Sequence, residues 1–280
     1  MNAPRVLILG ASGRLGCMLR RHWDEKDSIP LWQFRRAPEP PVSSGGVVIC
    51  DPLSGPPDCG PVDVVLGFAG VVPGKGALSL NSDLAIAAID SGVALGAKHV
   101  FVSSSAAIYG PSTAPLREQD AAHPVSDYGA AKLAMETAAL AQAARHGLPA
   151  TALRIGNVAG ADALLGPMGK SRRLDQFQNG RGPVRSYIGP AAFSAVLHAL
   201  VQLACQSNNL PPRLNLALSG GVAMADLCHV AGLPFGWQPA PDTALQCVVL
   251  DVSQLAALLP LPDADASAIV ADWQMDRRLS

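Results

Sequence analysis

The segment R-V-L-I-L-G-A-S-G-R-L-G, residues 5–16, decides the fold class of this chain. Residues 5–9 form an apolar run typical of a buried strand, and glycines follow at positions 10, 13 and 16. Such glycines allow a tight strand-to-helix turn in which the backbone approaches a pyrophosphate at the start of the helix. An ordinary glycine-rich turn is the alternative, because the spacing differs from the usual G-x-G-x-x-G. The cofactor-binding residues predicted here are Gly10, Ser12, Gly13, Arg14, Leu15 and Gly16.

Strands and helices alternate through the first half of the chain. We expect strands at residues 5–9, 30–34, 47–49, 62–66, 100–103 and 151–154, and helices at residues 13–23, 79–96 and 126–147. Such alternation implies a parallel sheet covered on both faces. The predicted fold class is therefore α/β, a Rossmann-type doubly wound parallel sheet with a smaller C-terminal substrate-binding region. Residues 1–158 would form the dinucleotide-binding domain, and residues 159–280 the substrate-binding region, which partly returns to pack on the first domain.

A tyrosine and a lysine stand four residues apart in Y-G-A-A-K, at Tyr128 and Lys132. On a helix this spacing places both side chains on one face. A free phenol has a pKa of about 10, and we expect the neighbouring ammonium to lower it. A serine hydroxyl from the run S-S-S at residues 103–105 can hold the substrate oxygen against the phenol. Ser105, Tyr128 and Lys132 are therefore predicted to be the catalytic residues that move a proton while a hydride carrier reacts.

Further motifs follow in an order that resembles a known family. They are F-A-G (68–70), S-S-S-A-A-I-Y-G (103–110), L-R-I-G-N-V-A-G (153–160), V-R-S-Y-I-G-P-A-A-F (184–193) and L-N-L-A-L-S-G-G (214–221). With the glycine turn and Y-G-A-A-K, they resemble the extended short-chain dehydrogenase/reductases. The resemblance is greatest to the nucleotide-sugar epimerases and dehydratases, typified by UDP-galactose 4-epimerase. It covers nearly the whole chain and loosens after about residue 240.

The resemblance implies roles for residues outside the catalytic set. Lys132 would also hold the nicotinamide ribose, and Ser105 would bond the reacting oxygen. Asn157 and Arg185 would bind substrate, with Arg185 on a diphosphate; a salt bridge from Arg185 to Asp162 or Asp175 is the alternative. Further cofactor contacts would come from Asp51, Leu53, Ala69 and Gly70. For Asp51, capping of the turn before Pro52 is an equal alternative.

The end of the second strand bears on the choice of cofactor. NAD enzymes place an acidic residue there, whereas NADP enzymes supply arginine for the 2′-phosphate. This chain has Arg35 and Arg36 and no acid within reach, and Arg14 could add a third cation. The alternative is that Arg35 and Arg36 are solvated surface arginines. The residues therefore favour NADP over NAD.

Departures from the family pattern reduce the number of reactions that the chain could catalyse. Ala106 and Ala107 stand where the dehydratases carry Asp-Glu. The chain therefore has no carboxyl group at these positions to catalyse the elimination of water. Ser186, Gly189 and Ala191 replace Asp, His and Asp of the substrate segment. The remaining hypotheses are a nucleotide-sugar epimerase or ketoreductase acting at a sugar carbon such as C4, an NADPH-dependent reductase of a smaller carbonyl compound, and a non-catalytic dinucleotide-sensing module.

The composition of the chain argues against several other classes of protein. The 280 residues are 49% hydrophobic and 15% charged, with a net charge of −1, so no basic field for nucleic acid or membrane is expected. The apolar stretches are shorter than the ~18 residues of a membrane span, and the N-terminus lacks a signal-peptide layout. The six cysteines show no metal-like spacing. We expect a cytoplasmic protein without a metal. Ala and Leu on several faces of two helices would suit a homodimer, although packing within one chain gives the same pattern.

Overall fold

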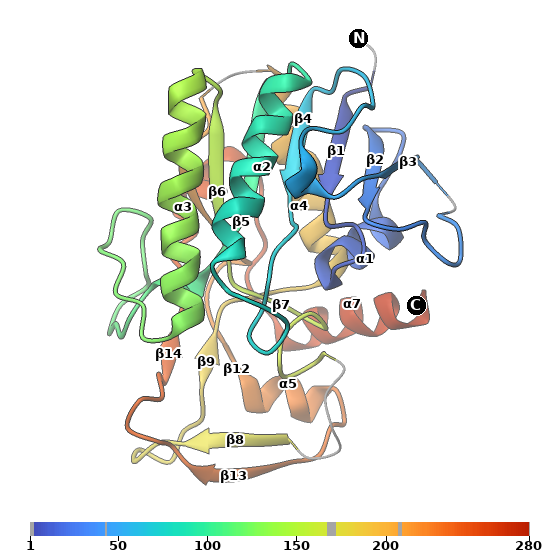
Figure 1. The fold of residues 1–280 in the computed structure, drawn as a ribbon. Coiled ribbons are helices and arrows are strands. Elements are labelled where there is room, and N and C mark those ends of the chain that lie inside the picture. Colours follow the sequence, from blue (N-terminus) through green and yellow to red (C-terminus); the bar gives the residue numbers. More distant parts are fainter. Residues whose placement is uncertain (1–2, 43, 167–171, 207–208, 280) are drawn as a thin grey trace.

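A seven-stranded parallel sheet forms the centre of the molecule (Figure 1). The computed structural model describes residues 3–42, 44–166, 172–206 and 209–279. In spatial order the strands are β11 (Arg213–Leu216), β6 (Ala150–Ile155), β5 (His99–Ser105), β4 (Val64–Gly67), β1 (Arg5–Leu9), β2 (Ile29–Phe34) and β3 (Gly46–Ile49). The order reverses between β1 and β4. In such sheets ligands bind beyond the carboxyl ends of the strands at this reversal.

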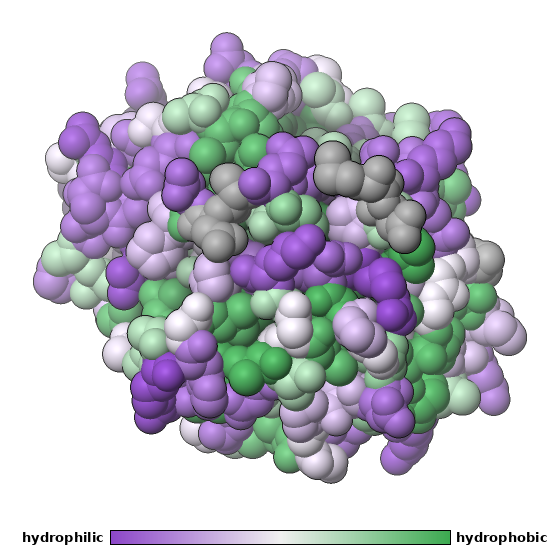
Figure 2. Space-filling view, turned by 90° about the horizontal axis from the view of Figure 1, so that it is seen from above, coloured by the Kyte–Doolittle hydropathy of each residue, from purple (hydrophilic) through white to green (hydrophobic). Residues whose placement is uncertain are grey.

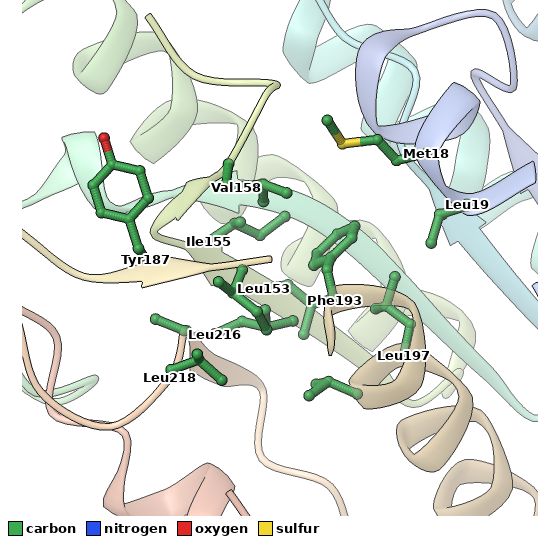
Figure 3. Close-up of a cluster of buried hydrophobic side chains, with 14 of the residues drawn as sticks. Met18, Leu19, Leu153, Ile155, Val158, Tyr187, Phe193, Leu197, Leu216 and Leu218 are labelled. Atoms are coloured by element: carbon green, nitrogen blue, oxygen red, sulfur yellow. The ribbon is translucent and has the colours of Figure 1, made fainter. Parts of the chain in front are cut away.

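Helices cover both faces of the sheet, as the sequence predicts. On one face lie α1 (Arg14–His22) and α4 (Pro190–Gln206), and on the other α2 (Leu80–Ala94) and α3 (Asp127–His146). Alternation along β1 sends Val6 and Ile8 into the first core and Leu7 and Leu9 into the second. Figure 3 shows the first core, where Phe193 of α4 lies among side chains of α1 and the strands. The doubly wound α/β fold is thereby confirmed.

The second half of the chain adds short elements beyond the carboxyl ends of the strands. The strands are β7 (Asn157–Val158), β8 (Arg172–Gln176), β9 (Val184–Arg185), β10 (Tyr187–Ile188), β12 (Val222–Ala223), β13 (Phe235–Pro239) and β14 (Cys247–Val248). The helices are α5 (Met224–Val230), α6 (Ser253–Leu258) and α7 (Ala266–Arg278). In Figure 1, β8, β13 and α5 lie below the sheet. By contrast, α4 and β11 return to the sheet itself.

Two aspartates fasten α7 to α4 and to α1. The Asp272 carboxylate accepts hydrogen bonds of 2.9 and 3.1 Å from two backbone N–H groups in the first turn of α4. Gly189 leaves room for it, because a Cβ there would lie 2.1 Å from the carboxylate. Asp276 accepts bonds of 2.7 and 2.6 Å from Arg21 of α1. These contacts hold α7 beside the start of α4 and along α1.

The edge at the amino ends of the strands is a mixed surface. Seen from above in Figure 2, hydrophilic and hydrophobic residues are interspersed over it. Among the helices that the structure describes, none has both the length and the hydropathy that crossing a membrane requires.

Candidate active site

A side chain of the neighbouring strand β2 holds the glycine turn between β1 and α1. Gly10 adopts a φ of 89°, and a Cβ there would lie 2.5 Å from the backbone nitrogen of Ala69. The buried Gln33 amide accepts a 2.9 Å bond from the Gly10 N–H and donates a 2.6 Å bond to the Cys50 carbonyl. No side chain caps the start of α1. Its first N–H groups are therefore left without a side-chain acceptor, as at the helix N-termini that bind phosphate groups.

A cavity of about 460 Å³ opens at the carboxyl ends of β4, β5 and β6. This volume lies within the range of small-molecule sites. Its lining includes Gly13, Arg14, Leu15, Gly70, Ser103, Ser104, Ser105, Tyr128, Lys132 and Asn157. Residues of the glycine turn and of the Y-G-A-A-K segment, more than a hundred positions apart, thus meet at one site.

Tyr128 and Lys132 lie on the first turns of α3. Ser126 caps this helix by accepting a 3.1 Å bond from the Gly129 N–H. The buried Lys132 ammonium donates a 2.8 Å bond to the Ser103 carbonyl and lies 5.9 Å from the centroid of the Tyr128 ring. Burial lowers the pKa of Lys132 to about 8, while the carboxylate of Glu136 acts in the opposite direction. The two side chains therefore share a face, as expected.

The expectation that Lys132 lowers the pKa of Tyr128 is wrong for this structure. Burial raises the pKa of Tyr128, and the smaller lowering effects come from Ser105 and Arg14. The physical reason is that removal from water disfavours the phenolate. In addition, the ammonium of Lys132 is directed to a backbone carbonyl. The neutral phenol is accordingly the resting form.

The three consecutive serines have different surroundings. Ser103 offers its carbonyl to Lys132, and Ser104 donates a 2.5 Å bond to the Glu136 carboxylate. Ser105 instead interacts with the Tyr128 phenol and accepts a 3.2 Å bond from a backbone N–H two residues on. Of the three, Ser105 is the one that acts on the Tyr128 phenol.

A buried ion pair behind the site was not predicted from the sequence. Glu136, one helical turn after Lys132, accepts a 2.9 Å bond from Nη2 of Arg154, and both side chains are almost completely buried. Arg154 also donates a 2.8 Å bond to the Tyr109 hydroxyl. The only sequence signal is a glutamate four residues after the lysine, which by itself is typical of any exposed helix.

Arg185 lines a second, adjoining cavity of about 340 Å³ that shares Ser105, Tyr128 and Asn157 with the first. Its guanidinium donates bonds of 2.7–2.9 Å to the carbonyls of residues 184, 245 and 246. Within the described residues it forms no salt bridge, and Asp162 accepts its 2.7 Å bond from Tyr187 instead. The alternative of a salt bridge to Asp162 or Asp175 is therefore not realised, and Asn157 and Arg185 meet at one pocket.

The remaining predicted cofactor residues lie around the glycine turn. Arg35 and Arg36 are exposed just beyond β2. Asp51 caps the short 3-10 helix Pro52–Ser54 by accepting a 3.0 Å bond from the Leu53 N–H, so the capping alternative is observed. Gly16 packs against the turn, since a Cβ there would lie 2.4 Å from the Gly10 carbonyl. Ser12 does not line the Tyr128 cavity but a separate one between α1 and α7.

Comparison with known proteins identifies the family. Residues 6–177 match the model of the NAD dependent epimerase/dehydratase family, which is more than half of the chain. The chain belongs to this family. The matched range includes the glycine turn, the serines, Tyr128 and Lys132, whereas Arg185 lies beyond it.

Curated relatives within the family are named UDP-glucose 4-epimerase. The protein of Azospirillum brasilense is 30% identical over 257 residues, which cover 82% of this chain and 66% of the relative. That of Corynebacterium glutamicum is 39% identical over 96 residues, which cover 34% of this chain and 28% of the relative. The chain thus spans just under two thirds of the first relative and a smaller share of the second.

Solved epimerase structures share the fold. UDP-glucose 4-epimerase from Brucella ovis, in complex with NAD, has a TM-score of 0.78 at 20% identity, with 96% of this chain and 97% of that chain covered. The enzyme from Stenotrophomonas maltophila, with bound NAD and formylated UDP-arabinopyranose, has a TM-score of 0.75 at 19% identity, with 99% and 98% covered. At these identities the likeness establishes the architecture of the family member described here.

Proposed function

We propose that this chain is a nucleotide-sugar 4-epimerase that works through a nicotinamide dinucleotide. The observation that carries the proposal is the meeting of Ser105, Tyr128 and Lys132 in one cavity with the glycine turn. Family membership and the UDP-glucose 4-epimerase relatives support the same reaction. Ala106 and Ala107 support epimerisation over dehydration, because they leave no carboxyl group beside Ser105 for the loss of water.

A dinucleotide in this cavity would take a hydride from C4 of the sugar and return it to the opposite face. Tyr128 would exchange the hydroxyl proton with that carbon's oxygen, and Ser105 would hold the oxygen against the phenol; their interaction at the wall of the cavity supports both roles. Because burial raises the pKa of Tyr128, the phenol carries its proton at neutral pH and would be the proton donor when a ketone oxygen is reduced. In the other half-reaction the phenolate would be stabilised by its hydrogen bond with Ser105 and by the charge of Arg14, the two groups that lower the pKa of Tyr128.

Arg185 gives the proposed substrate a second point of attachment. Three backbone carbonyls fix its guanidinium at the wall of the adjoining cavity. A guanidinium carries five N–H donors and matches phosphate oxygens in pairs. We infer that Arg185 binds the diphosphate of the nucleotide sugar while Asn157, shared by both cavities, lies beside the sugar.

The test is the interconversion of UDP-glucose and UDP-galactose by the purified protein, followed by proton NMR with NAD present. We expect an equilibrium mixture from either starting compound, without net reduction of NAD. If no UDP-hexose or UDP-N-acetylhexosamine is interconverted, the epimerase proposal fails. Dinucleotide binding without any conversion would instead identify a sensing module.

The second candidate is an NADPH-dependent carbonyl reductase, which the exposed Arg35 and Arg36 favour. Charge-assisted bonds to a 2′-phosphate contribute about 1.5–3 kcal/mol each, so NADPH should bind about tenfold or more tightly than NADH. The difference in affinity between NADPH and NADH should shrink in Arg35→Ala and Arg36→Ala. It should not change in Arg181→Ala, which replaces an exposed arginine in the loop after β8. Equal affinities in the unmodified protein would leave Arg35 and Arg36 as surface residues.

A further inference from the structure

A third cavity, of about 480 Å³, lies between α1, α7 and the loop that follows β7. Its described lining residues include four arginines and a single acid, Asp276; the arginines are Arg14, Arg21, Arg172 and Arg277. Four cations against one anion leave three net positive charges, in a chain whose net charge is −1. Such a concentration of charge in a concave site attracts anions.

Three of these arginines are anchored through only part of their guanidinium groups. Nη1 of Arg14 and Nε of Arg172 each donate to a backbone carbonyl of the loop after β7, at 2.5 and 2.9 Å. The Arg277 guanidinium stacks 5.1 Å from the centroid of the Trp273 ring. Since each guanidinium has five N–H donors, the anchored groups keep donors for a ligand. Anchoring also reduces the side-chain entropy that binding would cost.

Arg21 differs from the other three. It forms a bidentate pair with Asp276, and His22 contacts the same carboxylate at 2.9 Å. The single acid of the cavity is thus engaged with side chains of α1. The attraction for an anion therefore rests on Arg14, Arg172 and Arg277.

This cavity is separate from the one that contains Tyr128. Of the described residues that line the two, Arg14 alone belongs to both. Its bond to the Ala161 carbonyl connects α1 to the loop after β7 and stands between the two spaces. A ligand in the α1–α7 cavity would therefore lie beside the dinucleotide site, on the other side of Arg14.

We propose that the α1–α7 cavity binds a phosphate-bearing small molecule that is distinct from the dinucleotide. Guanidinium forks match the geometry of phosphate oxygens and pair with them bidentately. The volume exceeds that of a phosphate group and falls in the range of small-molecule sites. Met18 and Trp273 supply apolar wall for an organic part of the ligand, and Ser12 an additional hydroxyl.

Isothermal titration with inorganic pyrophosphate, with and without saturating NAD, tests this site. We expect pyrophosphate to bind in both conditions, because the site is separate from the glycine turn. Loss of one charge-assisted contact in Arg172→Ala or Arg277→Ala should weaken binding about tenfold or more. The neighbouring Arg173→Ala and Arg278→Ala are matched controls; both arginines are exposed and outside the lining, so their affinities should stay within about twofold.

Three results would overturn the proposal. The first is that NAD abolishes pyrophosphate binding, which would place the probe in the dinucleotide site. The second is equal weakening in the control variants, which would indicate a non-specific charge effect. The third is loss of binding in Arg185→Ala, which would place the probe in the substrate pocket. Melting temperatures of all variants establish that each is folded, and none of these readouts depends on epimerase activity.

Discussion

Burial moves the pKa values of Tyr128 and Lys132 in opposite directions. It raises the pKa of the phenol and lowers that of the ammonium to about 8. Both groups are therefore pushed towards their neutral forms, as expected when charged forms lose contact with water. The phenol therefore carries its proton near physiological pH, and Lys132 loses its proton closer to neutral pH than a free lysine does.

Tyr128→Phe should abolish most turnover and leave the fold intact. The substitution removes the hydroxyl that exchanges the proton, so we expect kcat to fall by about 10²- to 10⁴-fold. Dinucleotide affinity, measured by titration, and the melting temperature should stay close to those of the unmodified protein. Turnover within a few-fold of the unmodified protein would rule out Tyr128 as the acid/base.

Single residues also show where sequence reasoning ends. The Y-G-A-A-K spacing predicts the shared face of Tyr128 and Lys132, because helical geometry alone determines it. The hydrogen bonds by which Gln33 and Glu136 support the site could not be predicted, since their partners lie on other elements of the fold. The direction of the Tyr128 pKa was predicted wrongly, because the degree of burial cannot be derived from helical spacing.

At the scale of elements, the first six strands were predictable and the later ones were not. Each of β1 to β6 begins and ends within two residues of its expected bounds. Their apolar runs are long and bounded by turn residues, which is the pattern that sequence reasoning detects. Strands such as β7, β9 and β14 have two residues each and are defined by their partners rather than by any periodicity.

The turn between β1 and α1 should tolerate no side chain at Gly10. In Gly10→Ala, the Cβ would meet backbone of the segment after β4 at 2.5 Å, with φ at 89°. We expect a loss of roughly 3 kcal/mol or more in the free energy of unfolding, measured by urea denaturation, together with loss of dinucleotide binding. Gly236→Ala on the exposed strand β13 is the control, because nothing lies within 4 Å of a Cβ there. Equal stabilities of the two variants would contradict the geometry of the turn.

For the whole molecule, a continuous core joins the two halves of the chain. The cluster that contains Val6 and Met18 also contains Leu227 and Trp273. The return of α4 and β11 to the sheet explains how a chain that leaves the sheet after β6 is tied back to it. This path follows from β11 pairing beside β6, which motif spacing alone does not specify. The halves should therefore unfold together.

The molecule should lose stability in acid through His99. This histidine is buried at the start of β5, beside Thr151 at 3.0 Å, and burial lowers its pKa from 6.5 to about 4. Between pH 6.5 and 4 the unfolded chain binds a proton that the folded chain does not, so stability falls as the pH falls. This contribution is fully present above pH 6.5 and amounts to roughly 3 kcal/mol.

Urea denaturation at pH 7 and pH 4.5 checks this account. His99→Gln should lose less stability between the two pH values than the unmodified protein does. His123→Gln is the control, because its side chain is exposed. If His99→Gln and His123→Gln have the same pH dependence, the buried histidine is not the group responsible.

The most direct test of the central claim follows the hydrogen at C4 of the sugar. The chain should convert UDP-glucose deuterated at C4 into UDP-galactose, with catalytic NAD and in ordinary water. Because the hydride is taken from C4 and returned to the same carbon within one cavity, mass spectrometry and NMR should find the deuterium retained at C4. Formation of UDP-galactose that has lost the deuterium to water, or no UDP-galactose at all, would contradict the account.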